Sequence, residues 1–315
     1  MAAYDRYSAI GAREDLTDVI YDISPTDTPI MSTIGKTKAT SVTHEWQTDS
    51  LAAATTANAL VEGASASEAT LSPTTRLANL TQIVGKTVMV SGTLLASDLA
   101  GRKSEMAYQL AKASAEIKRD IETIITANQG QAAGSSGSSA RKMGSLLSYI
   151  KTNTSKNGTS VTGVDPTTLG VSTRTDGSTR AFTETILKDV IAKVFSSGGT
   201  PSALFVSPAQ KQVVSGFTGL SAQRYQVPTS GQATILAGAD LYQSDFGVLQ
   251  IVPNRFMRTR DALVLDPEYA ALAYLRPFQT IDIAKVGDAE KKQILAELTL
   301  EVRNEAAHGG AFDLS

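Results

Sequence analysis

Two Gly-Lys-Thr triplets, at Gly35–Thr37 and Gly85–Thr87, are the part of the sequence that most resembles a phosphate-binding loop. Such a loop needs a further glycine five positions earlier, so that backbone amides can approach the phosphates. That position holds Ile30 in one case and Leu80 in the other. Lys86 also lies in a strand-like pattern, where a solvated lysine is the ordinary explanation. We therefore expect no nucleotide site.

The two histidines, His44 and His308, lie nearly at opposite ends of the chain. Neither has the close His-Glu-x-x-His or His-x-His spacing that zinc sites use. His44 beside Glu45 and Trp46 is typical of a strand residue that faces a neighbour, and His308 lies in a terminal loop pattern. The histidines predict no metal site.

Residues for nucleophilic or acid-base catalysis are equally sparse. The chain has no cysteine, and Gly134–Gly137 lacks the Gly-x-Ser-x-Gly spacing of a hydrolase elbow. Solvated faces account for acid pairs such as Asp240 with Asp245 or Glu297 with Glu301. We predict no catalytic residue and no cofactor. A hydrolase that acts through Asp or Glu is the alternative from another class, and a deep polar pocket with perturbed carboxylates would favour it.

Composition predicts a globular chain with a sizeable core. Of 315 residues, 42% are hydrophobic, and 29 Lys and Arg against 31 Asp and Glu leave a net charge of -2. This balance provides no field for binding nucleic acid or an anionic membrane. No apolar stretch approaches the roughly 20 residues that span a bilayer. The first ten residues do not resemble a signal peptide, so we expect a cytoplasmic protein.

The first hundred residues predict extended elements. Residues 1–40 read as an arm, because two prolines prevent a continuous helix. Residues 42–49 alternate with the period of a half-exposed strand. Residues 51–75 are too small and polar to hold a core, and residues 77–90 read as a returning strand. The pair predicts a long two-stranded flap, which needs a neighbour to rest on.

The rest of the chain predicts mixed helix and sheet. Apolar residues from Met106 to Ile125 recur at steps of three and four, which indicates a helix at 103–128 on the order of 35 Å long. Residues 130–139 and 152–177 read as loops. The remaining predictions are a helix at 184–195, a helix that opens at Ser207, and strands at 203–206, 248–252, 262–265, 270–275, 281–284 and 296–302. The fold class is α+β.

Several stretches resemble a family of tailed-bacteriophage major head proteins with the Hong Kong 97-type capsid fold, once catalogued as a domain of unknown function. The resemblance covers most of the chain and depends on the order of its segments. These segments are Arg13–Pro29, His44–Trp46, Asn79–Val90, Glu116–Glu122, Ser244–Gly247 and Ala284–Glu290.

The resemblance implies a division of the chain into named parts. They are an N-terminal arm at 1–40, an extended β-hairpin loop at 41–95, a spine helix with peripheral-domain and inserted loops at 96–180, an axial domain at 181–260, and C-terminal strands shared by the axial and peripheral domains at 261–315.

The resemblance also implies a function. A major capsid protein of this kind self-assembles through pentamers and hexamers into an icosahedral or prolate head that encloses double-stranded DNA without sequence-specific binding. It is assembled in the bacterial cytoplasm and ends in the virion, and no membrane is involved. The chain lacks a long, charged, helical scaffolding segment at its start, so we expect a separate scaffolding protein. The resemblance implies a portal protein and a decoration protein as further candidate partners. A nanocompartment shell of the encapsulin type is the alternative within the same fold.

Contacts between subunits can be nominated only coarsely. Trp46, the single tryptophan, is a candidate anchor because aromatic side chains concentrate binding energy at interfaces. Packing within the subunit at the base of the flap explains it equally well. The further candidates are His44, Arg76, Lys86 and Arg119.

Some capsids with this fold crosslink through an isopeptide bond between a lysine in the extended loop and an asparagine. This chain has no lysine between Lys38 and Lys86. We therefore expect shells that are held together by noncovalent contacts.

Overall fold

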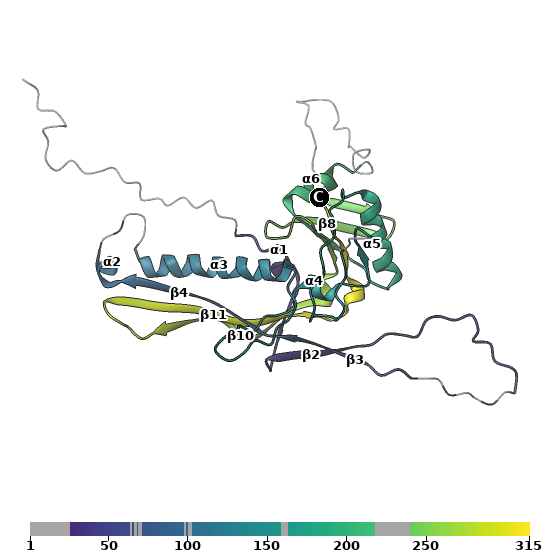
Figure 1. The fold of residues 1–315 in the computed structure, drawn as a ribbon, viewed down its shortest axis with the longest axis horizontal. Coiled ribbons are helices and arrows are strands. Elements are labelled where there is room, and N and C mark those ends of the chain that lie inside the picture. Colours follow the sequence, from purple (N-terminus) through teal and green to yellow (C-terminus); the bar gives the residue numbers. More distant parts are fainter. Residues whose placement is uncertain are drawn as a thin grey trace, which may run out of the picture.

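A computed structural model describes residues 26–63, 65, 68, 71–97, 99, 103–158, 163–217 and 240–315. In this part of the chain a long helix lies beside a ribbon of strands, both join a compact lobe, and a hairpin extends from the body (Figure 1). The helices are α1 (Pro29–Thr33), α2 (Gly92–Ala96), α3 (Glu105–Thr126), α4 (Leu146–Tyr149), α5 (Glu184–Ser196) and α6 (Pro208–Ser215), with single 3₁₀ turns at Pro267–Tyr269 and Glu305–Ala307. The strands are β1 (Gly35–Lys38), β2 (Thr43–Thr48), β3 (Thr75–Leu80), β4 (Gln82–Ser91), β5 (Thr154–Ser155), β6 (Ala203–Val206), β7 (Leu241–Ser244), β8 (Gly247–Pro253), β9 (Ala262–Leu265), β10 (Ala270–Ile283), β11 (Ala289–Val302) and β12 (Gly309–Ala311).

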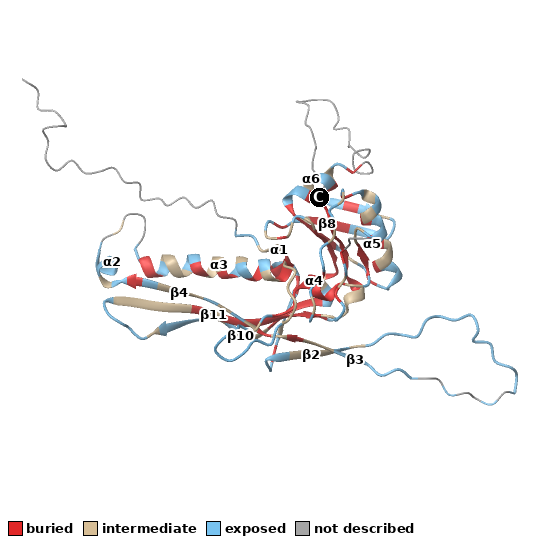
Figure 2. Cartoon of the chain, viewed as in Figure 1, coloured by how far each residue is buried: buried red, intermediate tan, exposed pale blue. Residues whose placement is uncertain are grey.

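Helix α3 confirms the helix that was predicted at 103–128. Ser104 caps its first turn, since the Ser104 hydroxyl accepts a hydrogen bond from the Ala107 amide at 3.3 Å. Ile117, Ile121 and Ile125 are buried on one face, which lies against the ribbon of strands (Figure 2). Burial of each such side chain contributes about 1.5 to 3 kcal/mol, so the apolar face holds the helix along the ribbon.

The ribbon is a four-stranded sheet in the order β1-β10-β11-β4. Strands β10 and β11 form a long hairpin, and Gly287 in its turn has a φ of 74°, a conformation that favours glycine. The prediction of separate strands at 270–275 and 281–284 was wrong. Pro277 lies where the register shifts between Arg276 and Gln279. At such a bulge the missing proline N–H costs no ladder hydrogen bond, so β10 continues.

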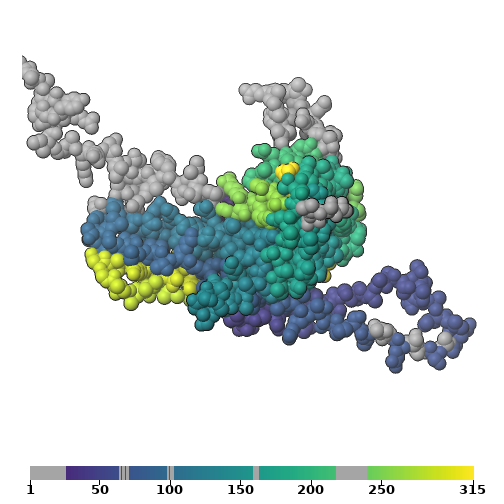
Figure 3. Space-filling model, in the orientation of Figure 1, coloured from purple at the N-terminus to yellow at the C-terminus, as the bar shows by residue number. Residues whose placement is uncertain are grey.

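The returning strand of the flap is also different from the prediction. Residues 77–90 do not form one strand, because the chain changes partners at Thr81. Strand β3 pairs with β2, whereas β4 pairs with β11 in the ribbon. We call β2, β3 and the loop 49–74 between them the flap. Its paired part is short, and its described loop residues are exposed and lie away from the body (Figures 2 and 3).

The lobe is built on a six-stranded sheet in the order β5-β12-β9-β6-β8-β7. Strand β6 is buried on both faces, because Leu204 and Val206 pack with α5 while Phe205 joins the core of α3 and the ribbon. The predicted helices at 184–195 and after Ser207 are confirmed as α5 and α6, and the predicted strands at 203–206, 248–252 and 262–265 as β6, β8 and β9.

Part of the predicted arm is packed into the body. Helix α1 begins at Pro29, and the amides of Ile30 and Met31 donate to the buried carboxylate of Glu122 on α3 at 2.8 and 2.9 Å. Burial raises the pKa of Glu122, and the hydrogen bonds from Met31, Ile30 and Asn254 oppose this shift. Residues 1–25 of the predicted arm lie outside the described residues.

Candidate assembly surfaces

The nominated residue His44 lies on β2 at the base of the flap. Its Nε2 atom is 3.0 Å from Oε2 of Glu301 on β11. Thr37 and Arg303 each donate to the same carboxylate at 3.0 Å. Burial alone would raise the pKa of Glu301, but these hydrogen bonds hold it below its ordinary value. His44 therefore fastens the flap to its own subunit.

Trp46 packs within the subunit. Its ring lies between those of His44 and Tyr149, with centroid distances of 5.8 and 6.0 Å. The side chain is half-buried against the main core, and its indole Nε1 is buried without a hydrogen-bond partner among the described residues. This is the packing at the flap base that the sequence left open, and a role in binding a second chain stays a prediction.

Arg76 is the third nominated residue at the flap. It lies on β3, and its guanidinium is 3.5 Å from the carboxylate of Glu45 across the strand pair. Both side chains are exposed, so the pair itself stabilises the flap little.

Lys86 and Arg119 lie apart from the flap, where the ribbon meets α3. Lys86 Nζ is 2.8 Å from Glu116 and 3.3 Å from Asp120. The hydrogen bond between Lys86 and Glu116 raises the pKa of the lysine and lowers that of the carboxyl. The Arg119 guanidinium lies 5.5 Å from the centroid of Phe256, a cation–π contact between α3 and the lobe. The five nominated residues therefore form no single cluster.

The loop of the flap exposes apolar and acidic groups. Leu51, Leu60 and Leu71 are 98%, 81% and 88% exposed. The charged residues of the sequence from 49 to 74 are all acidic, namely Asp49, Glu62 and Glu68. An isolated two-stranded hairpin is marginal in water. This surface is therefore suited to lie on another protein surface that is partly apolar and partly basic.

A second unpartnered surface lies on the ribbon. Strand residues alternate between two faces, and Lys86 and Val88 of β4 point toward α3 and the core. The opposite face, which we call the ribbon face, comprises Thr87, Met89, Ile281, Ile283, Lys291 and Gln293. Met89 is 62% exposed and Ile281 is 39% exposed. The ribbon face combines apolar side chains with a lysine.

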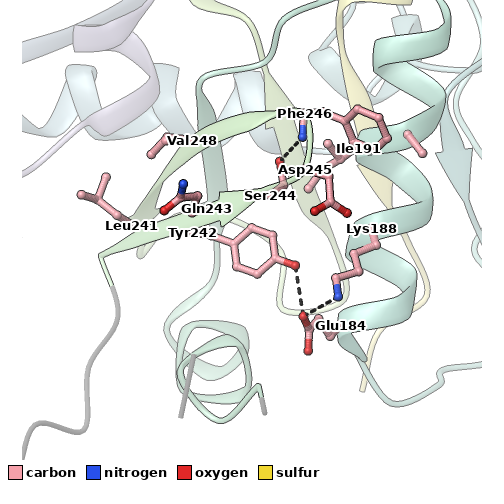
Figure 4. A pocket seen from close by; sticks show the side chains of 11 residues that line it. Glu184, Lys188, Ile191, Leu241, Tyr242, Gln243, Ser244, Asp245, Phe246 and Val248 are labelled. Atoms are coloured by element: carbon pink, nitrogen blue, oxygen red, sulfur yellow. Dashed lines mark hydrogen bonds and ion pairs between the residues drawn. The ribbon is translucent and has the colours of Figure 1, made fainter. Parts of the chain in front are cut away.

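The lobe carries an open hollow of about 600 Å³ between α5 and the β7–β8 hairpin (Figure 4). Ile191 and Phe246 line its walls, and the polar side chains at its edge include Glu184, Lys188 and Tyr242. Lys188 Nζ lies 2.9 Å from Glu184, and the Tyr242 hydroxyl donates to the same carboxylate at 3.2 Å. Burial and the charge of Glu184 raise the pKa of Tyr242 to about 12. Glu184 thus pairs with both Lys188 and Tyr242 at the edge of the hollow.

The lobe contains a buried ionic cluster that the sequence did not predict. Arg174 has no exposed side-chain surface, and its guanidinium lies 3.6 Å from the centroid of Phe312. Asp165 and Asp313 lie 3.6 and 3.7 Å from it. Because these residues come from a loop and from the last residues of the chain, their contacts hold both on the lobe. Burial lowers the pKa of Arg174, and the nearby carboxylates oppose this shift.

The cluster continues at the turn before β9. Arg260 Nη2 lies 3.0 Å from Asp313, and Arg258 Nη1 lies 3.2 Å from Asp261. Both carboxylate oxygens of Asp261 are buried without a hydrogen-bond partner in the described part of the chain. Its pKa is raised to about 6, mainly by burial. Because the charges are dispersed among the loops of the sequence, no spacing reveals this cluster.

Among the described residues, no three His, Asp or Glu side chains gather as a metal ion would require. None of the described helices has the length and apolar character to span a membrane.

Comparison with known proteins gives concordant findings. The family model for the SU10 major capsid protein matches residues 3–315. A curated relative, the major capsid protein of Escherichia phage Phieco32, is 27% identical over 337 residues, which cover 97% of this chain and 95% of that protein.

Solved structures with the same architecture include the capsid asymmetric unit of cyanophage A-1(L). It has a TM-score of 0.70 at 12% identity, with 96% of this chain and 97% of that chain covered. A chain of Gordonia phage Cozz has a TM-score of 0.62 at 11% identity, with 97% and 92% covered. The capsid of a native GTA particle gives 0.62 at 12% identity, with 98% of each chain covered. At such identities these likenesses show the fold alone.

Proposed function

The chain belongs to the SU10 major capsid protein family, and from that premise we propose how it builds a shell. It is a phage major capsid protein with the Hong Kong 97-type capsid fold, and it assembles with itself into capsid shells. We propose that pentamers and hexamers of the chain form an icosahedral or prolate head around double-stranded DNA. The near-zero net charge suits a wall that encloses DNA without binding it tightly.

In this proposal the flap of one subunit lies on the ribbon face of a second subunit. The observation that carries it is the exposure of both surfaces, since the loop of the flap has Leu60 at 81% and the ribbon face has Met89 at 62%. The acidic residues of the flap fit Lys291 at the centre of the ribbon face. Many such contacts, each weak, add up over a closed shell.

We further propose the named parts of the subunit for this chain. Residues 1–40 are the arm, 41–95 the extended loop with β4 paired into the ribbon, 96–180 the spine helix and peripheral loops, 181–260 the axial domain, and 261–315 the shared strands. The protein acts by assembly and has no catalytic role. It is made and assembled in the bacterial cytoplasm and resides in the virion.

A scaffolding protein, a portal protein and a decoration protein are the proposed partners. Expression with and without a candidate scaffolding protein tests this. Efficient formation of uniform shells from this chain alone would remove the reason for such a partner.

Crosslinking tests the contact between the flap and the ribbon face. The chain has no cysteine, so Leu60→Cys and Met89→Cys provide unique thiols. A short bismaleimide applied to assembled shells of the double variant should give covalent multimers in a denaturing gel. The matched control pairs Leu60→Cys with Val213→Cys, since Val213 on α6 is also exposed. Multimers in the control but not in the test variant would refute the proposed contact.

A further inference from the structure

The chain returns from the flap to the body of the subunit at a single residue. Thr81 is the residue between β3, which belongs to the flap, and β4, which belongs to the ribbon. It is fully buried. Its amide donates to the Val42 carbonyl at 2.8 Å, its carbonyl accepts from Arg141 Nε, and its hydroxyl donates to Glu297 at 2.7 Å. Both backbone groups and the side chain of Thr81 are therefore held.

Asn79, two residues earlier on β3, is also fully buried. Its Nδ2 donates to the carbonyls of Gly144 at 3.1 Å and Leu300 at 2.7 Å. Its Oδ1 accepts from the amides of Gly144 at 2.8 Å and Leu80 at 2.9 Å. These four hydrogen bonds use both donors and both lone pairs of the amide. They join the flap to the loop before α4 and to β11.

The residues of the body that lie next to Asn79 and Thr81 are tightly packed. The Gln82 side-chain oxygen accepts from the Met143 amide and from Gln129 Nε2, each at 3.1 Å. A Cβ atom at Gly144 would lie 2.5 Å from the Gly170 carbonyl oxygen, so this close approach requires glycine. The loop that binds Asn79 is itself fixed and provides a firm support.

We propose that Asn79 and Thr81 are positioning residues that set the direction of the flap before a second copy of the chain binds. We call these two residues and their contacts the joint. A fully satisfied buried polar network specifies one arrangement, because any other leaves buried groups unpaired. A flap held in its binding direction loses less conformational freedom on assembly. This proposal depends on the proposed role of the flap in assembly, and it adds the residues that set the direction of the flap.

Distance measurement in the unassembled subunit tests the joint. Nitroxide labels at Ser50→Cys and Met89→Cys, both exposed, report the angle between flap and ribbon. Because Thr48 pairs with Thr75, Ser50 lies level with residue 73, which is 16 residues before Met89. At about 3.3 Å per strand residue the labelled positions lie roughly 53 Å apart if the two elements are collinear. Pulsed electron paramagnetic resonance then gives the width of the distance distribution.

Asn79→Ala should broaden this distribution about twofold and reduce the yield of closed shells, because four buried groups lose their partners. Thr75→Ala, at the exposed outer end of β3, is the matched control and should leave both unchanged. A folded Asn79→Ala subunit with the width of the parent protein would overturn the proposal.

Tyr149→Phe provides a second variant in case Asn79→Ala does not fold. It removes only the hydroxyl that donates to the Ala78 carbonyl at 3.0 Å beside the joint. A broader distribution is expected, and an unchanged width would count against the joint. Because the labels are read in the unassembled subunit, this result does not depend on where the flap docks. The bismaleimide experiment tests that docking separately.

Discussion

The ionic cluster predicts an unusual dependence of stability on pH. Asp261 is buried, its two carboxylate oxygens lack hydrogen-bond partners in the described part of the chain, and its pKa is raised to about 6 from 3.8. The folded state therefore binds a proton on the Asp261 carboxylate more tightly than the unfolded state does. The stability that the proton contributes is fully present below pH 3.8 and is lost as the pH rises through about 6.

Asp261→Asn removes this titration, because the amide resembles the protonated acid in shape and stays uncharged. One pKa unit corresponds to about 1.4 kcal/mol, so the full shift corresponds to about 3 kcal/mol. Between pH 4.5 and 7.5 the variant should gain about 2 kcal/mol of unfolding free energy relative to the parent chain. Subtracting the unfolding free energy of the parent chain from that of the variant removes the pH-dependent contributions of other groups, among them His308. Burial lowers the pKa of His308 to about 4, so its contribution to stability is present above pH 6.5 and is lost as the pH falls through about 4.

Chemical unfolding of the unassembled subunit at a series of pH values measures this difference. Asp240→Asn is the matched control, because it makes the same chemical change in a side chain that is 93% exposed. A flat difference between Asp261→Asn and the parent chain would refute the reasoning. A stability gain of Asp261→Asn that becomes smaller as the pH rises would also refute it. Such a result would show that the attraction between Asp261 and Arg258 outweighs the cost of burying the charge.

Three further predictions follow from the same structure. Trp46→Ala should lower the yield of particles and leave a soluble, folded subunit, as electron microscopy and circular dichroism would show; unchanged yield would count against an anchor role. Particles boiled in detergent should run as monomers, because the flap has no lysine for an isopeptide bond; a ladder of multimers would contradict this. Ile121→Ala should cost the subunit about 2 to 5 kcal/mol in denaturant unfolding, since the side chain is fully buried between α3 and the ribbon; a loss below 1 kcal/mol would contradict the core assignment.

Elements with strong local patterns were predictable from the sequence. The three- and four-residue steps from Met106 to Ile125 predicted α3 to within two residues at each end, because one stripe of the helix is buried over most of its length. The alternation at 296–302 likewise identified part of β11. In α3 the burial of one face follows from the period of the residues themselves. In β11 the period identified a strand, but the interpretation of Glu297 and Glu301 as part of a solvated face was wrong. Both side chains are buried, and they accept hydrogen bonds from Arg276 and Arg303.

Features that depend on contacts distant in sequence were not predictable. Residues 77–90 read as one strand because nothing local reveals that Thr81 binds Glu297 and Arg141. Asn79 begins a segment that carried the family resemblance, but no local pattern revealed that its side chain is fully buried. No local pattern singled out Arg174, since one of its carboxylate partners, Asp313, lies far from it in the sequence. The nominated contact residues stay predictions, because assembly surfaces depend on a second copy.

Cryo-electron microscopy of the purified protein, with and without a co-expressed scaffolding candidate, tests the account most directly. The account predicts closed shells built of pentamers and hexamers, in which each flap lies on the ribbon face of a neighbouring copy. Monomers or dimers under every condition, or shells in which the flap contacts only its own subunit, would contradict it.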